Sequence, residues 1–204
     1  MEISNRLKSI PPYVFAELDK KRQAVVARGV DVINLGIGDP DQPTPGFIVE
    51  AMQAALNNPL NHRYPPFGGS KEFKETVVAW CKTRFGIDIS AENEITSLIG
   101  SKEGIHNVIS AFVDPGDYSL IPDPAYPVYR SSTILAGGIP YGMPLLPENN
   151  YLADFDAIPA EVVKKAKVLF LNYPNNPTAA VCDLAYLERA VAFARKHNLL
   201  FVHD

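Results

Sequence analysis

The chain has 204 residues, of which 47% are hydrophobic and 21% charged, so it is long enough to bury a core and has an ordinary globular composition. Its net charge of −4 argues against general binding to nucleic acid or to an anionic membrane surface. No segment reaches transmembrane length, and the N-terminus lacks the apolar stretch of a signal peptide. Cys81 and Cys182 have no metal-type spacing. We expect two reduced thiols and a cytoplasmic protein.

The start of the chain predicts an arm followed by part of a small domain. A first helix is expected between Pro12 and Gly29, and a short strand over 31–35 follows it. A second helix is expected to begin at Pro45 with Thr44 as its cap.

A helix from about Ser70 to Phe85 precedes a region in which strands and helices alternate. The expected strands are short apolar runs at 95–99, 118–121, 139–143, 168–171 and 199–203. The helices between them are expected at 102–112, 124–136, about 154–165 and 184–197. Strands separated by helices imply right-handed crossovers and a mostly parallel sheet. We therefore predict an α/β fold, with an arm and small-domain segment at 1–60 and the N-terminal part of a large domain at 61–204.

The strand at 199–203 has the composition of a fully buried strand, although it is the last in the chain. A buried central strand needs neighbours on both sides. We therefore expect the sheet to be incomplete and the chain to be the N-terminal part of a longer protein.

A glycine-rich loop, Gly100-Ser101-Lys102-Glu103-Gly104, joins a predicted strand to a predicted helix. Exposed amides at a helix start, together with the helix dipole, suit a phosphate group. The loop matches neither a Walker loop nor a GxGxxG fingerprint, so a tight turn without a ligand is the alternative.

Three further candidates follow predicted strands, where ligands bind in open α/β sheets. Tyr126 can stack on a flat heteroaromatic ring, although an ordinary half-buried tyrosine fits the same position. Asn176 can donate to a phenolate oxygen or simply complete its turn. Asp204 can keep a pyridine nitrogen protonated or cap a following helix.

Six motifs appear in a fixed order along the chain: LGIGDP, YPPFGGS, GSKEG, DPAYP, YPNNPT and FVHD. From about Arg6 to Asp204 the sequence resembles the fold-type I, class I/II aminotransferases, which depend on pyridoxal 5′-phosphate (PLP). The segments RLKSIPPYVFAELDKKR and LGIGDPDQPTP are most similar to the LL-diaminopimelate aminotransferases of lysine biosynthesis. The resemblance implies a three-layer large domain and the transfer of an amino group from an amino acid, with glutamate as the first choice, to a 2-oxo acid.

The resemblance also implies contacts to the cofactor. Ser101 and Lys102 would anchor the PLP phosphate, and Tyr126 would lie on the cofactor ring. Asn176 would contact the 3-oxygen, and Asp204 would contact the pyridine nitrogen.

Three more residues are assigned by the resemblance. Tyr64 would reach the phosphate in the neighbouring subunit, which implies a homodimer with shared active sites; otherwise it is an aromatic residue in a Pro/Gly loop. Tyr13 and Gly38 would face the substrate, and Gly38 would let its backbone amide approach a carboxylate closely. A plain turn glycine is the alternative for Gly38.

The resemblance places the Schiff-base lysine beyond Asp204, together with the arginines for the phosphate and the substrate carboxylate. Lys102 belongs to the phosphate side and not to this role. We therefore expect no catalytic residue within the 204 residues and no transaminase activity from this chain alone.

Other functions stay open. Aminotransferases of the aspartate, alanine or methionine type share these motifs, and a natural short product would be a dimerising fragment without catalysis. A PLP-sensing transcription regulator would need a DNA-binding module, which residues 1–60 do not supply. A nucleotide-binding domain would need an acidic residue for the ribose, and the chain offers no convincing candidate.

Overall fold

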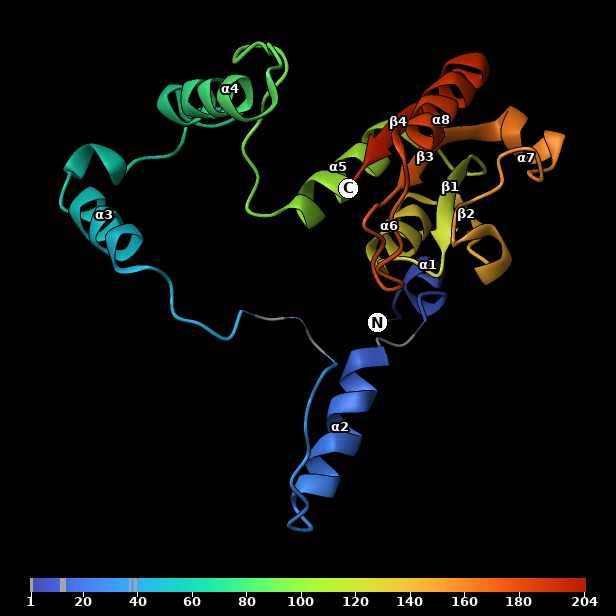
Figure 1. Cartoon of the computed structure of the whole chain (residues 1–204), viewed down its shortest axis with the longest axis horizontal. Helices are drawn as coiled ribbons and strands as arrows, with labels where there is room; N and C mark the ends of the chain where they lie inside the picture. The colour runs from blue at the N-terminus through green and yellow to red at the C-terminus, as the bar shows by residue number, and fades with distance from the viewer. Residues whose placement is uncertain (1, 12–13, 37, 39) are drawn as a thin grey trace. The chain divides into compact units, whose positions relative to one another are not determined.

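The computed structural model describes residues 2–11, 14–36, 38 and 40–204 (Figure 1). The chain divides into two compact units, one comprising Met1–Ile10 and Leu98–Asp204 and the other Pro11–Ser97. The division between residues 60 and 61 that the sequence suggests stays a prediction.

The first unit contains a parallel sheet, which confirms the predicted α/β fold. Its described strands are β1 (Tyr118–Asp123), β2 (Ile139–Pro144), β3 (Ala166–Leu171) and β4 (Leu200–His203). They lie in the order β2-β1-β3-β4, and each neighbouring pair is parallel. Leu171 pairs with His203, so β3 and β4 end side by side.

Helices cover both faces of this sheet, which gives three layers (Figure 1). The described helices of the unit are α1 (Asn5–Lys8), α5 (Ser101–Phe112), α6 (Val128–Ala136), η2 (Pro147–Asn149), α7 (Ala160–Lys165) and α8 (Leu184–His197). Alternate residues of a strand point to opposite faces. Phe170 of β3 therefore joins the apolar cluster of α5 and α6, whereas its neighbour Leu169 joins the cluster of α7 and α8.

Several predicted helix ends are confirmed. Asp183 caps α8 by accepting the Tyr186 N–H at 2.8 Å, and Asn198 ends the helix in the left-handed conformation. Gly137 ends α6 with φ = 90°, a value that glycine adopts without a Cβ penalty.

Two predicted helices begin later than expected. The helix expected from Pro124 is α6, which starts at Val128. Pro127 has no N–H to donate to the carbonyl of Asp123, so the first turn forms only after it. Asp123 ends β1, and Pro127 occupies the N-cap position of α6. The helix expected near Asp154 is α7, which starts after Pro159, because the Asp154 side chain forms a local turn with the Asp156 N–H at 3.0 Å.

Two predicted strands are wrong. The described segments 31–35 and 95–99 contain no strand. In the second segment the Ser97 N–H donates to the Gly68 carbonyl at 3.0 Å and the Ile99 N–H donates to Glu103 at 2.8 Å. A strand exists only through hydrogen bonds to a neighbouring strand, and among the described residues neither segment has one.

The second unit is helical within its described residues. It contains α2 (Val14–Val26), α3 (Gly46–Leu56), η1 (Pro59–Asn61) and α4 (Lys71–Phe85). The prediction for α4 is confirmed, since the Ser70 hydroxyl accepts the Phe73 N–H at 3.2 Å and Gly86 ends the helix at φ = 71°. Thr44 does not cap α3, because Pro45 occupies the N-cap position.

Throughout the part of the chain that the structure describes, every helix is too short or too polar to span a lipid bilayer.

Candidate functional site

Strands β1, β3 and β4 end at one edge of the sheet, and a candidate residue follows each of them. The chain passes from β1 to β2 on one side and then to β3 on the other side, so the strand order reverses between β1 and β3. In open α/β sheets, ligands bind at such a reversal, outside the carboxyl ends of the strands. Tyr126 follows β1, Asn176 follows β3, and Asp204 follows β4.

Asp204 is held at this edge through both its side chain and its backbone. Its Oδ2 accepts a hydrogen bond from the Tyr129 hydroxyl at 2.5 Å, and its backbone N–H donates to the Leu171 carbonyl at 3.0 Å. Tyr129 is fully buried. Burial raises the pKa of the Tyr129 phenol, and the hydrogen bond to Asp204 and its charge raise this pKa further. The phenol therefore stays protonated and remains the donor.

Asn172, the residue directly after β3, connects Asn176 with Asp204. Its Nδ2 donates to the Asp204 backbone carbonyl at 2.8 Å, and its Oδ1 accepts the Asn176 backbone N–H at 2.6 Å. One side-chain amide thus fixes the backbone of Asn176 relative to that of Asp204. Asn176 is exposed, which leaves its own side chain accessible from solvent.

Asn175 stabilises the same loop from a buried position. Its Oδ1 accepts the N–H and the hydroxyl of Thr178 at 3.2 and 2.9 Å, and its backbone pairs with Ala179 and Ala180. Its Nδ2 is buried without a partner among the described residues. The loop therefore retains one unused amide donor.

Tyr126 lies between Tyr129, the partner of Asp204, and the start of α5. Its half-buried ring packs edge-to-face on Tyr129, with ring centroids 6.0 Å apart, and the Lys102 Nζ lies 5.4 Å from the centroid of the Tyr126 ring. Ser101 is the first residue of α5, and the N-cap residue Gly100 provides no side-chain cap. The positive end of the α5 dipole and the Lys102 ammonium thus lie on the same side of the site.

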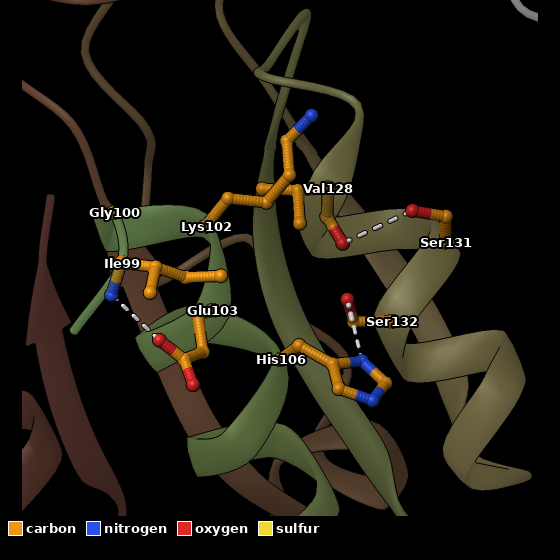
Figure 2. A pocket seen from close by; sticks show the side chains of 8 residues that line it. All are labelled: Ile99, Gly100, Lys102, Glu103, His106, Val128, Ser131 and Ser132. Atoms are coloured by element: carbon orange, nitrogen blue, oxygen red, sulfur yellow. Dashed lines mark hydrogen bonds between the residues drawn. The ribbon is translucent and has the colours of Figure 1, made fainter. Parts of the chain in front are cut away.

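A pocket of about 490 Å³ opens between the starts of α5 and α6 (Figure 2). It is lined by Ile99, Gly100, Lys102, Glu103, His106, Val128, Ser131 and Ser132. The His106 Nδ1 lies 3.2 Å from the Ser132 hydroxyl, and Glu103 holds the Ile99 N–H. The exposed lining is mainly apolar, and Lys102 of the proposed phosphate side belongs to it.

The chemistry of these side chains fits a flat, phosphorylated pyridine. A lysine and a helix N-terminus suit the phosphate, and the Tyr126 ring suits the face of a heteroaromatic ring. The Asn176 amide and the Asp204 carboxylate are a donor and an acceptor for the polar atoms of that ring. The contacts through Tyr129 and Asn172 bring Lys102, Tyr126, Asn176 and Asp204 into one connected network.

The remaining candidates lie outside this network. Tyr64 and Gly38 belong to the unit Pro11–Ser97. Tyr64 is 97% exposed, and a Cβ at Gly38 would meet no atom within 4 Å, so the described residues give no steric reason for glycine there. Tyr13 lies outside the described residues. The roles of all three stay predictions.

Tyr129 and Asn172 connect the predicted residues, yet the sequence prediction does not include them. Asn172 is the first residue after an apolar strand, the position from which ligand contacts come in parallel sheets. Tyr129 follows Tyr126 by one helical turn. The position of Asn172 is a signal that the sequence offers, whereas the spacing of Tyr129 alone does not distinguish it from a core residue.

The sequence model of the family described as aminotransferase class I and II matches residues 30–204. The chain is 58% identical, over its whole length, to the LL-diaminopimelate aminotransferase of Gloeobacter violaceus and covers 52% of that relative. It is 54% identical to the LL-diaminopimelate aminotransferase of Aquifex aeolicus, with 100% of the chain and 52% of the relative covered.

Two solved structures are similar to this chain over nearly all of its length. The substrate-bound BacF structure from Bacillus subtilis has a TM-score of 0.92 and 41% identity, covering 100% of this chain and 52% of that one. A probable N-succinyldiaminopimelate aminotransferase from Thermus thermophilus has a TM-score of 0.86 and 37% identity, covering 94% of this chain and 52% of that one. The chain thus spans about half the length of the proteins it matches.

Proposed function

The chain belongs to the class I and II aminotransferases, and on this basis we propose that the complete protein is a transaminase acting on an amino acid and a 2-oxo acid. The observation that carries the proposal is the connected network of Lys102, Tyr126 and Asp204 at the reversal of strand order. Enzymes of this family use PLP, which supplies an electron sink for the carbanion formed at the substrate α-carbon.

Five residues of the chain are proposed to hold this cofactor. Asp204 stabilises the protonated pyridine nitrogen, because an opposite charge nearby favours the charged form. Asn176 donates to the 3-oxygen, and Tyr126 packs on the ring. Ser101 and Lys102 bind the phosphate at the N-terminus of α5.

The lysine that bonds to the cofactor and the arginine for the substrate carboxylate are proposed to lie in the half of the relatives that this chain does not span. The support is the coverage of 52% of both the relatives and the solved structures. On this proposal, the 204 residues expressed alone have no transaminase activity, and the full-length protein is active.

In the proposed reaction, glutamate donates its amino group to an oxo acid derived from tetrahydrodipicolinate. The product of this transfer is LL-diaminopimelate. Support comes from relatives of 58% and 54% identity, both named LL-diaminopimelate aminotransferase. Activity with the substrates of other class I/II aminotransferases is the competing outcome when single amino donors are compared.

A homodimer with shared sites is also proposed, in which Tyr64 reaches the phosphate in the partner and Tyr13 and Gly38 face the substrate. The high exposure of Tyr64 agrees with a contact supplied by another subunit. A cytoplasmic location is proposed as well, supported by the free thiols of Cys81 and Cys182.

The test uses purified full-length protein titrated with PLP and then mixed with single amino donors. Glutamate and LL-diaminopimelate are expected to abolish the visible absorbance of the bound cofactor, and aspartate and alanine are expected to act far more slowly. Asp204→Asn should lower kcat by about a hundredfold or more, whereas Glu188→Gln on the exposed side of α8 should not change it. A spectrum insensitive to every amino donor would refute the transaminase, and a preference for aspartate or alanine would refute the substrate assignment.

A further inference from the structure

We propose that Tyr129 is a positioning residue for the cofactor, because its hydroxyl holds one oxygen of Asp204 and thereby directs the other oxygen to the pyridine nitrogen. The inference rests on the proposed role of Asp204. It adds a residue that the cofactor itself does not touch.

Tyr129 is packed so that its hydroxyl has one direction available. Its ring stacks on Phe170 of β3, with centroids 4.9 Å apart and an angle of 20° between the planes. On another side it meets the Tyr126 ring edge-to-face at 86°. Both Tyr129 and Phe170 are fully buried, so the ring cannot turn without opening the core between α6 and the sheet.

The hydrogen bond uses one of two oxygens. Tyr129 donates to Oδ2 of Asp204, and Oδ1 is therefore the oxygen left for a ligand. A donor paired with an ionised carboxylate forms a stronger bond than a neutral pair and favours the ionised form. Burial and the neighbouring Asp204 raise the pKa of the Tyr129 phenol, so the phenol keeps its proton and remains the donor.

The geometry also couples the two contacts expected at the pyridine ring. Tyr126, which packs on the ring face, touches Tyr129, which holds the carboxylate for the ring nitrogen. Tyr126 directly precedes Pro127, the N-cap residue of α6, and Tyr129 is the second residue of that helix. The start of α6 therefore sets the ring plane and the nitrogen contact together.

The test is a double-mutant cycle of Tyr129→Phe and Asp204→Asn in the full-length protein, read by PLP affinity. Tyr129→Phe keeps the ring packing and removes only the donor. We expect about a tenfold loss of affinity, the size of one hydrogen bond to a charged group. We expect a larger loss for Asp204→Asn, and no further loss when Tyr129→Phe is added to it, because the two residues act through one contact.

The spectroscopic readout is the ¹⁵N signal of PLP labelled at the pyridine nitrogen. Tyr129→Phe should move this signal toward that of the unprotonated pyridine at the same pH, a change that loss of stability alone would not produce. Replacing Tyr129 by the more acidic 3-fluorotyrosine keeps the fold and should move the signal in the opposite direction.

The matched control is Tyr186→Phe. Tyr186 is also buried, and its hydroxyl bonds to the Ala153 backbone on the opposite face of the sheet. This variant should lose stability and leave the ¹⁵N signal unchanged.

The outcomes separate the two proposals. If Asp204→Asn changes neither affinity nor signal, the cofactor role of Asp204 is wrong, and the inference fails with it. If Asp204→Asn acts but Tyr129→Phe is silent, or adds fully to it, only the inference on Tyr129 is overturned.

Discussion

At the scale of single residues, the site depends on hydrogen bonds that join loops distant in sequence. Asn172 bonds to the backbones of both Asn176 and Asp204, and the Tyr129–Asp204 bond spans 75 positions. The two Asn172 bonds join the loop after β3 to the residue after β4, and the Tyr129 bond joins α6 to that same residue. Loss of the hydrogen bonds of Asn172 or of Tyr129 should therefore disturb the positions of the site residues more than the pairing of the strands.

We predict that Asn172→Ala lowers the free energy of unfolding of the full-length protein by about 2 kcal/mol, because it removes two hydrogen bonds from one side chain. PLP affinity should fall as well, since Asn176 and Asp204 lose their common support. Urea unfolding and PLP titration measure the two effects. Asn107→Ala, on an exposed position of α5, is the control, and equal values for the two variants would contradict the role of Asn172.

The buried phenols predict a loss of stability at alkaline pH. Burial raises the pKa of both Tyr129 and Tyr186 above the unfolded value of about 10. A group whose pKa is higher in the folded protein contributes stability below its unfolded pKa, and this contribution disappears as pH rises toward the folded value. Urea midpoints of the full-length protein should therefore fall above about pH 10.

Tyr129→Phe and Tyr186→Phe should each flatten this alkaline decline, since each removes one titrating phenol. A wild-type midpoint that stays constant from about pH 9 to pH 11 would contradict the assignment of these two groups.

At the scale of elements, sequence signals predicted the ends of α8 and the positions of β1 to β4, because nearby residues largely determine these features. Helix α8 starts and ends where Asp183 and Asn198 indicate, and β1 to β4 lie where apolar runs predict them. The segment 95–99 has a similar apolar pattern but no strand, because pairing depends on a neighbour that the local sequence does not specify.

Prediction of the candidate site from sequence is limited in the same way, because its contacts depend on distant parts of the chain. Tyr126, Asn176 and Asp204 were predictable as residues that follow strands. Tyr129 was not, because a buried tyrosine at the start of a helix looks like an ordinary core residue until its partner is known. The hydrogen bond that distinguishes it is a property of the tertiary structure.

The cap of α8 gives a prediction at this scale. Asp183→Ala should lower the free energy of unfolding by about 1 kcal/mol, because the Tyr186 N–H loses its acceptor. Glu188→Ala, at an exposed position of the same helix, should have little effect, and urea unfolding of the full-length protein compares the two. Equal stability of both variants would show that the cap does not hold α8.

At the scale of the whole molecule, the chain forms a parallel sheet of the order β2-β1-β3-β4 and spans about half the length of the proteins it matches. The residues proposed to bind PLP, apart from Tyr64, lie in the unit of Met1–Ile10 and Leu98–Asp204. Tyr126, Asn176 and Asp204 follow strands on both sides of the reversal of strand order, and Ser101 and Lys102 begin α5. Relatives of 58% and 54% identity cover the entire chain and are matched over about half of their own length. On our proposal, transaminase chemistry therefore needs residues that this chain does not span in addition to those described here.

A crystal structure of the full-length protein with PLP bound tests the assignment of the site most directly. The pyridine nitrogen should lie about 3 Å from the free oxygen of Asp204, with the ring against Tyr126 and the phosphate at Ser101. A cofactor bound at another edge of the sheet, or bonded covalently to Lys102, would contradict the proposed site.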